Sequence, residues 1–304
     1  MHAKPVERLA FAALLAGASG IGFAPIFVRW SEVGPVATAF YRVGFALPVL
    51  GLWMGFENQR AASDRSKSPA MPSSWCQKMV LARWAFVAAG SFFAADLAIW
   101  HWSLRLTTVA NSTLITNFTP FFVMFGARLL FQERITRLLL GGLALALAGG
   151  TMLVGSSLQL TLDHVLGDLL ALVTAVFYAG YLLAVKHLRR TFSTATTMTG
   201  SGLVSCPLFL VVAVLSAEPL APHTGRGWVV LVALALVSHV GGQGLIAYAL
   251  AHLPASFSAV GLLVQPVVAA VLAWVLLGER LQTLQVFGGV LILAGIAVAS
   301  RATR

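Results

Sequence analysis

The sequence predicts an all-α integral membrane protein with ten transmembrane helices, arranged as two inverted five-helix repeats around a central cavity. Three observations support this fold class. The 304 residues are 59% hydrophobic and 10% charged, with a mean hydropathy of +0.87. Ten apolar stretches are each long enough to cross a bilayer. Residues 104–149 also align with residues 250–295 without a gap.

The composition excludes an ordinary soluble domain, which carries about 25% charged residues. Because this chain has too few polar residues to cover its apolar surface, lipid is the expected solvent. The ten predicted spans are residues 9–29, 35–56, 79–103, 107–130, 137–155, 165–186, 197–217, 227–251, 255–277 and 283–300. The connections are short, and the one sizeable polar stretch, residues 57–78, is predicted to be a flexible loop.

The net charge of +10 does not indicate a nucleic-acid partner, because the basic residues lie at the ends of the spans. Such residues orient membrane proteins, since loops on the cytoplasmic side are enriched in Lys and Arg. With the N-terminus inside, 15 of the 20 basic residues are cytoplasmic, four lie outside and Arg42 lies within the second span. We therefore expect both termini to be cytoplasmic. The first span is predicted to be a retained helix rather than a cleaved signal, because its apolar run continues to about residue 28.

The internal alignment relates positions 146 residues apart. The matched residues include a proline, a Glu-Arg corner and two glycines of each half: Pro120/Pro266, Glu133–Arg134/Glu279–Arg280, Gly142/Gly288 and Gly149/Gly295. We expect a first repeat at residues 1–156 and a second at residues 157–304. Five spans in each repeat place the second repeat upside down in the membrane. Inverted repeats are typical of transporters that hold substrate near the bilayer midplane.

Prolines and glycines mark special positions in several spans. Proline removes a backbone hydrogen bond and can kink a helix, and a freed carbonyl in a membrane needs a polar neighbour or a cavity. Pro48, Pro120, Pro207 and Pro266 are therefore predicted to be hinges or kinks, with a static kink as the alternative to a hinge. Seven glycines are predicted to allow close helix packing: Gly141, Gly142, Gly149, Gly150, Gly288, Gly289 and Gly295.

The ten spans, the mid-helix prolines and the corners "FQERIT" and "LLGERLQ" resemble the EamA branch of the drug/metabolite transporter superfamily. The most specific part is the segment from Pro266 to Arg280, followed by "GGVLILAGI". The resemblance covers nearly the whole chain. It implies a basket-like bundle in a bacterial cytoplasmic (inner) membrane, with helices 1, 3, 4, 6, 8 and 9 around the cavity and helices 5 and 10 at the periphery. A monomer without cofactor or metal is expected.

Within that family the chain is similar to the YddG-type exporters of amino acids. This implies export of aromatic and other neutral amino acids by alternating access. Export of another small metabolite or of a cationic drug is the alternative, although the first-span glutamate of small multidrug proteins is absent. Proton exchange and facilitated export both remain open.

Ionisable residues inside lipid are costly, so they face the bundle interior or water. Asp96 is the acid near the middle of the third span, and we predict that it binds a substrate amine or couples protons. The alternatives are a partner for Arg42 or a polar group at a helix end. Trp100 follows Asp96 by one turn on the same face and is predicted to stack on substrate or to cover a cation, with a place in an interfacial aromatic belt as the alternative. His101 and Trp102 are assigned to an interfacial aromatic belt, and Arg42 to a structural or gating role.

Four further substrate-binding residues are predicted in the fourth, sixth, eighth and ninth spans. Asn117 lies three residues before Pro120, and the resemblance places Asn117, Tyr178 and Gln243 on the cavity wall. Gln265 precedes Pro266 as Thr119 precedes Pro120, which makes it a candidate by symmetry.

His239 is the last candidate for substrate binding. It lies four residues before Gln243, so the two share a helical face. The alternative is a helix–helix hydrogen bond.

Other functional classes lack their motifs. The sequence has no HExxH, no GxSxG, no P-loop lysine and no paired aspartates in its spans, so a membrane enzyme and direct use of ATP are not predicted. No filter-like ring indicates a channel. A purely structural protein has no need of polar, kinked fourth and ninth helices.

Overall fold

The computed structural model describes residues 5–65, 75–154 and 164–302. Within these residues ten helical segments are long and apolar enough to cross a membrane: Pro5–Trp30, Pro35–Arg60, Ala82–Leu106, Asn111–Phe131, Arg137–Val154, Val165–Leu188, Thr194–Leu215, Gly225–His252, Ala255–Leu277 and Thr283–Arg301. They coincide with the ten predicted spans and differ mainly at the ends. The predicted fold class is confirmed.

Five of the spans are single helices. They are α5 (Trp75–Leu106), α8 (Arg137–Val154), α9 (Val165–Leu188), α10 (Thr194–Leu215) and α15 (Thr283–Arg301). Pro207 lies inside α10, which continues through it.

The other five spans are interrupted. Four of them consist of two α-helices each: α1 (Pro5–Gly22) and α2 (Ala24–Trp30), α3 (Pro35–Gly44) and α4 (Ala46–Arg65), α6 (Val109–Thr116) and α7 (Thr119–Phe131), α13 (Ala255–Gly261) and α14 (Val264–Leu277). The eighth span contains the π-helix η3 (Leu234–Gln243) between α11 (Gly225–Ala233) and α12 (Gly244–His252).

Proline explains where several interruptions occur. Pro120 is the second residue of α7 and Pro266 the third residue of α14, immediately after the breaks of the fourth and ninth spans. Pro48 is the third residue of α4, after the break at Phe45. Pro25 follows a break at Phe23 that the sequence analysis did not anticipate. Because proline has no N–H to donate to the preceding turn, a new helix begins at it more readily than an old one continues.

The polar stretch 57–78 differs from the prediction of a loop. Helix α4 continues to Arg65 and α5 begins at Trp75, so residues 57–65 and 75–78 are helical. Residues 57–65 include Glu, Gln, Arg and Ala, which favour helix, and a helix that leaves the membrane does not need apolar side chains to continue in water. Residues 66–74 lie outside the described residues.

The corners that follow α7 and α14 show the duplication in backbone geometry. Gln132 after α7 and Gly278 after α14 both have left-handed backbones, with φ of 57° and 69°. The next residue donates its N–H six residues back in both corners, from Glu133 to Ala127 at 3.2 Å and from Glu279 to Ala273 at 3.3 Å. This is the helix-ending motif in which a left-handed residue lets the chain turn back on its last carbonyls. All these pairs are 146 positions apart.

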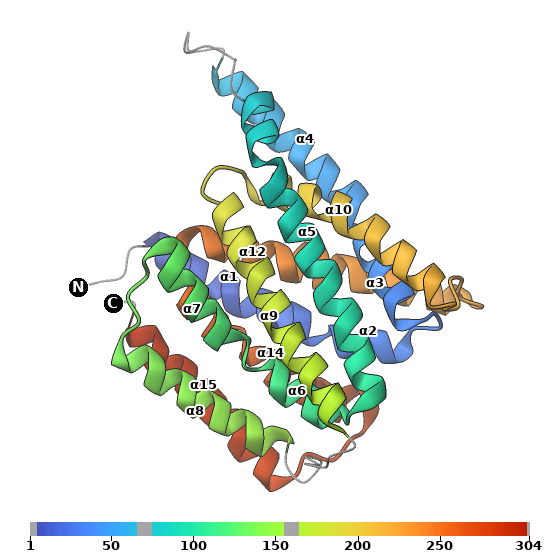
Figure 1. Cartoon of the computed structure of the whole chain (residues 1–304), viewed down its shortest axis with the longest axis vertical. Helices are drawn as coiled ribbons and strands as arrows, with labels where there is room; N and C mark the ends of the chain where they lie inside the picture. Colours follow the sequence, from blue (N-terminus) through green and yellow to red (C-terminus); the bar gives the residue numbers. More distant parts are fainter. Residues whose placement is uncertain (1–4, 66–74, 155–163, 303–304) are drawn as a thin grey trace.

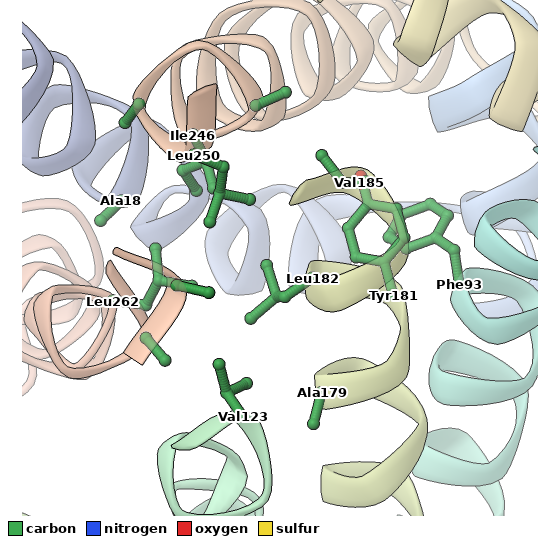
Figure 2. Packing of buried hydrophobic residues seen from close by; sticks show 14 of the residues in the cluster. Ala18, Phe93, Val123, Ala179, Tyr181, Leu182, Val185, Ile246, Leu250 and Leu262 are labelled. Carbon is green, nitrogen blue, oxygen red and sulfur yellow. The ribbon is translucent and has the colours of Figure 1, made fainter. Parts of the chain in front are cut away.

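The two halves share one hydrophobic core. Figure 2 shows Phe93 of α5 against Tyr181 of α9, and Val123 of α7 below Leu182 of α9. Ile246 and Leu250 of α12 complete this cluster from the second half. Helix α5 packs on α9 and α10, and α1 packs on α12, η3 and α14. The core therefore contains contacts between the two halves as well as contacts within each half.

Helices α8 and α15 lie side by side at the edge of the bundle (Figure 1). The two helices approach most closely at two pairs of glycines, Gly149 with Gly288 and Gly142 with Gly295. A Cβ added to Gly149 would lie 2.5 Å from the carbonyl oxygen of Gly288, and one added to Gly142 would lie 2.6 Å from that of Gly295. The predicted packing role is confirmed for these four glycines, whereas Gly141 has open space around it.

The side on which α1 begins and α15 ends is called the terminal side, and the opposite side the distal side (Figure 1). On the distal side two carboxylates join the α2–α3 connection to the loop between α10 and α11. Glu32 accepts hydrogen bonds from the backbone N–H groups of His223 at 2.8 Å and Thr224 at 2.9 Å, and from the Thr224 hydroxyl. Glu218 accepts one from the Ala37 N–H at 2.8 Å.

The Glu32 contacts predict a pH-dependent stability. The hydrogen bond from the Thr224 hydroxyl, with those from the backbone, holds the pKa of Glu32 below its ordinary value of 4.5. Because the folded-state pKa is depressed, the stabilisation is complete above pH 4.5 and is lost as the pH falls through the folded-state value. We expect Tm in detergent to fall between pH 6 and pH 3 by less in Glu32→Gln than in the wild type. An equal fall in both proteins would contradict this assignment.

Candidate transport cavity

A cavity of about 260 Å³ lies between the two halves. Its wall comes from the first, second, third, fourth, sixth, eighth and ninth spans. Six of the seven predicted substrate-binding residues line it: Asp96, Trp100, Asn117, Tyr178, Gln243 and Gln265. The second span, which the resemblance did not include, contributes Pro35, Thr38, Ala39 and Arg42.

The wall residues lie toward the distal side of the bundle. In the first span they occupy residues 21–28, near its distal end, and in the second they begin at Pro35, where the chain returns from the distal side. In the third span they run from Phe93 to His101, near the distal end of α5. The cavity therefore extends from the middle of the bundle to the distal side.

One face of α5 forms a continuous part of the wall. Phe93, Asp96, Leu97, Trp100 and His101 follow the spacing i, i+3, i+4, i+7 and i+8, which places them on one side of a helix. The assignment of His101 to an interfacial belt was wrong, because this side chain is buried and lines the cavity. The helical spacing from Asp96 and Trp100 was the signal that would have found it. The next residue, Trp102, lies exposed on the outer surface.

The break in the fourth span supplies the polar groups of another part of the wall. Helix α6 ends at Thr116, and Asn117 lies in the turn before α7. The hydroxyls of Thr116 and Thr119 donate to the carbonyls of Thr113 at 2.9 Å and Thr116 at 2.7 Å. The carbonyl of Thr116 has no helical donor, because residue 120 is proline, and the Thr119 hydroxyl takes that place. The carbonyl of Thr113 also accepts the backbone N–H of Asn117 at 3.2 Å. The Asn117 side chain is half-buried and contributes to the cavity wall.

The sixth, eighth and ninth spans bring three further side chains together. Tyr178, Gln243 and Gln265 all line the cavity, and the amide nitrogen of Gln265 has no hydrogen-bond partner among the described residues. Gln243 is the last residue of the π-helix η3, and helical irregularities of this kind are frequent at functional sites. Pro266 also lines the cavity, next to Gln265 and close to the break of the ninth span.

His239 occupies a different place from the other predicted residues. Its ring centroid lies 5.6 Å from that of Phe93, which itself lines the cavity, so His239 packs behind the wall. Neither ring nitrogen has a hydrogen-bond partner among the described residues. The alternative of a helix–helix hydrogen bond is thus not found for this side chain either.

Asp96 and Arg42 are the two oppositely charged residues of the wall. Each is 7% exposed. In the described part of the chain, no nitrogen of the Arg42 guanidinium lies within 4.0 Å of a carboxylate oxygen of Asp96, so the two form no ion pair. The alternative that Asp96 is the salt-bridge partner of Arg42 is therefore not observed. Arg42 was assigned to a structural or gating role and was not predicted to line the cavity, but its side chain does so.

The terminal side of the bundle is held closed by Glu133, which follows α7. Its carboxylate accepts hydrogen bonds from the backbone N–H groups of Ala255 at 2.7 Å and Ser256 at 3.0 Å, and from the Ser256 hydroxyl at 2.6 Å. The bonds connect the end of the fourth span to the start of the ninth, and thus join the two halves.

Three basic side chains at the end of the sixth span reinforce this closure. Lys186 donates to the carbonyl of Leu253 at 2.7 Å, and the guanidinium of Arg189 donates to the carbonyl of Ala247 at 3.0 Å. The guanidinium of Arg190 lies 4.6 Å from the centroid of the Phe131 ring, at the end of α7. The chain segments that surround the terminal end of the bundle are thereby linked to one another.

The distal side has a more open counterpart. Glu279, which matches Glu133 in the repeat, pairs with Arg29 at the end of α2. Both side chains of this pair are more than half exposed, at 52% and 62%. The two equivalent corners therefore differ in the partners they hold. The cavity wall includes residues near the distal ends of the first, second and third spans and none near their terminal ends.

The sequence profile of the EamA-like transporter family matches residues 8–155 and again residues 165–301. The chain belongs to this family. The predicted membership of the EamA branch is confirmed, and its members are transporters. The ten-span fold, the duplication and the cavity between the halves agree with membership of a transporter family.

Comparison with individual proteins agrees with this assignment. The pseudopaline exporter CntI of Pseudomonas aeruginosa is 29% identical over 220 residues, which are 70% of this chain and 73% of the relative. The uncharacterized transporter YxxF of Bacillus subtilis is 23% identical over 229 residues, 74% of this chain and 71% of the relative. A crystal structure 19% identical in sequence has a TM-score of 0.74 and covers 100% of this chain and 99% of that chain, which shows the same fold.

Proposed function

We propose that this EamA family member is a secondary transporter that exports amino acids, aromatic and other neutral ones included, across the cytoplasmic membrane. The observation that carries the proposal is the size and composition of the cavity. Its volume of about 260 Å³ lies below the roughly 300–1,000 Å³ of pockets for drug-sized ligands. A substrate the size of a single amino acid suits this space better than a bulky drug does.

The groups on the wall match what a neutral amino acid needs. The carboxylate of Asp96 is an acceptor for an ammonium group. The side-chain amides of Asn117 and Gln243 offer donors and acceptors, and Trp100 provides a flat apolar surface for a side chain. Few charged groups and many apolar ones favour broad selectivity among neutral side chains.

The mechanism that the repeat supports is alternating access. With both termini cytoplasmic, the terminal side is the cytoplasmic side, and this structure is the outward-open state. Inverted repeats related by a two-fold axis supply a second state in which the two halves exchange conformations. Substrate then enters from the cytoplasm when the Glu133 contacts are released. The protein acts as a monomer in this scheme, with one cavity per chain.

A second candidate is export of another metabolite from the same cavity. The observation that favours it is the similarity to the P. aeruginosa pseudopaline exporter, at 29% identity over 70% of the chain. Pseudopaline is therefore one of the compounds to be tested beside amino acids.

Counterflow in proteoliposomes tests the proposal. Purified protein is reconstituted with one unlabelled amino acid inside, and uptake of labelled phenylalanine is followed without an imposed proton gradient. We expect transient accumulation with several neutral amino acids inside and none in protein-free liposomes. No accumulation of labelled phenylalanine with any amino acid inside, together with uptake of labelled pseudopaline into liposomes loaded with unlabelled pseudopaline, would replace the proposal by the second candidate.

Two wall substitutions are expected to lower this counterflow without unfolding the protein. Asn117→Ala removes an amide from the wall, and Trp100→Ala removes the apolar surface. We expect each to lower the initial rate about fivefold, the equivalent of roughly 1 kcal/mol for one net hydrogen bond or aromatic contact. The exposed neighbours Phe118→Ala and Trp102→Ala, which lie off the wall, are the matched controls. Wild-type rates in both wall variants would exclude these residues from the substrate site.

A further inference from the structure

The cavity wall holds one acidic and one basic side chain that form no ion pair with each other. Asp96 on α5 and Arg42 on α3 are each more than nine-tenths buried, and both line the wall. For Asp96, no hydrogen bond is found among the described residues. The ion pair found among them, Arg29–Glu279, lies at the distal surface.

The guanidinium of Arg42 is only weakly satisfied. Its Nη2 donates to the backbone carbonyl of Ser238 at 3.4 Å, which is long for such a bond, and its Nε has no partner. Its Cζ lies 5.9 Å from the centroid of the Phe93 ring. Phe93 lies one turn before Asp96 on the same face of α5, so an aromatic ring stands beside both charged groups. The bond to Ser238 is thus the one hydrogen bond that the guanidinium makes among the described residues, out of five possible donors.

Buried charges that are left unpaired are costly, and the cost is recovered only when each charge acquires a partner. A ligand with one charge would satisfy one residue and leave the other buried and unpaired. A ligand with an ammonium and a carboxylate group satisfies both at once. A ligand that leaves one buried charged group without a partner binds much more weakly than one that pairs both, which makes such sites selective.

We infer that Asp96 and Arg42 form a two-pole site for zwitterions, in which Asp96 binds the ammonium group and Arg42 the carboxylate. The inference rests on the proposed function and narrows its substrate class to compounds that carry both groups. The substrate side chain lies toward Trp100, one turn beyond Asp96. Amines without a carboxylate and carboxylates without an amine are rejected, although they have the same apolar part.

Three compounds that share one side chain test this inference: phenylalanine, phenethylamine and 3-phenylpropionate. Each is added in excess outside proteoliposomes during counterflow of labelled phenylalanine. We expect unlabelled phenylalanine to inhibit uptake at concentrations at least tenfold lower than the other two compounds. Inhibition by the amine or the acid at the same concentration as phenylalanine would overturn the two-pole site and leave amino acid export intact. Absence of phenylalanine counterflow in the wild type would overturn the proposed function itself.

Two variants assign the poles. Asp96→Asn removes the charge that binds ammonium, so the advantage of phenylalanine over 3-phenylpropionate is expected to shrink at least tenfold. Arg42→Gln is expected to shrink the advantage over phenethylamine in the same way. Glu7→Gln and Arg226→Gln, which change the same charges at exposed positions away from the cavity, should leave both ratios unchanged. A parallel loss toward all three compounds would indicate a structural role and overturn the assignment.

A direct binding measurement keeps the inference testable where a variant does not fold. The thermal stability of the wild-type protein in detergent is measured with each of the three compounds. We expect phenylalanine to raise Tm, because a ligand that binds only the folded state stabilises it, and the two single-pole compounds to give no shift at the same concentration. Equal shifts with all three would again contradict the two-pole site.

Discussion

Replacing Glu133 with alanine is expected to open the terminal side of the bundle and to shift the protein away from the conformation of this structure. The substitution removes the three hydrogen bonds that join the end of the fourth span to the start of the ninth. Hydrogen bonds to a charged group are worth about 1.5–3 kcal/mol each, and about 1.4 kcal/mol is a factor of ten in an equilibrium. The ratio of protein in this conformation to protein in the alternative one should therefore fall tenfold or more.

Labelling of a single cysteine at Val28 measures this shift. Val28 lies on the distal part of the cavity wall, so its accessibility reports whether that side is open. In a background without Cys76 and Cys206, Glu133→Ala is expected to slow the reaction of Val28→Cys with a maleimide about tenfold. Counterflow should fall with it, because one of the two states of the cycle is depleted.

The equivalent substitution in the second repeat is the matched comparison. Glu279 has the same place in its corner, 146 positions later, but pairs with Arg29 at an exposed site. The two-fold relation between the repeats predicts that Glu279 stabilises the opposite state, so Glu279→Ala should leave labelling at Val28 unchanged or faster. Slower labelling in both variants would show that these corners maintain the fold rather than the conformational equilibrium.

Replacing Gly149 with leucine should have the largest effect on folding. Even the Cβ atom of the new side chain would lie 2.5 Å from the carbonyl oxygen of Gly288 and 2.7 Å from the backbone nitrogen of Ile292. Both are backbone atoms of α15, so the overlap can be relieved only by separating the helices. Overpacking usually costs about 1–3 kcal/mol, and an obstacle made of backbone belongs at the upper end of that range.

Size-exclusion chromatography and thermal unfolding in detergent measure this effect. We expect Gly149→Leu to lower both Tm and the yield of monodisperse protein. Gly141→Leu, on the same helix but with no atom within 4 Å of an added Cβ, should match the wild type. If the two variants were equally stable, the close contact of α8 with α15 would not contribute to stability.

Most of the architecture followed from local patterns in the chain. Apolar stretches of about 20 residues define the spans, because a bilayer requires this length and leaves little freedom. The corners at Glu133 and Glu279 and the glycine contacts of α8 and α15 were visible as matched residues, since a repeat must preserve its close contacts. The polar end of α4 was predicted wrongly, because hydropathy reports where the membrane ends and not where the helix ends.

The candidate site was predictable in part. Asp96 and Trp100 could be chosen because a charged residue and an aromatic residue one turn apart in a membrane span seldom face lipid. Gln243 and Tyr178 came from the family resemblance, and their position on the cavity wall now depends on the arrangement of the sixth, eighth and ninth spans. His101 was misplaced, because an aromatic ring near the end of a span occurs both at interfaces and in cavities.

The amino-acid sequence alone determined the ten spans, the inverted repeat and the family, because these depend on hydropathy and on residues near one another in the chain. Only the tertiary structure decided that Arg42 and Asp96 line one cavity without forming an ion pair, and that Glu133 and Glu279 hold different partners. Those facts depend on distances between helices that are far apart in sequence. The two corners share nearly the same local sequence but hold different partners. The packing between the two halves therefore decides which partners each corner finds.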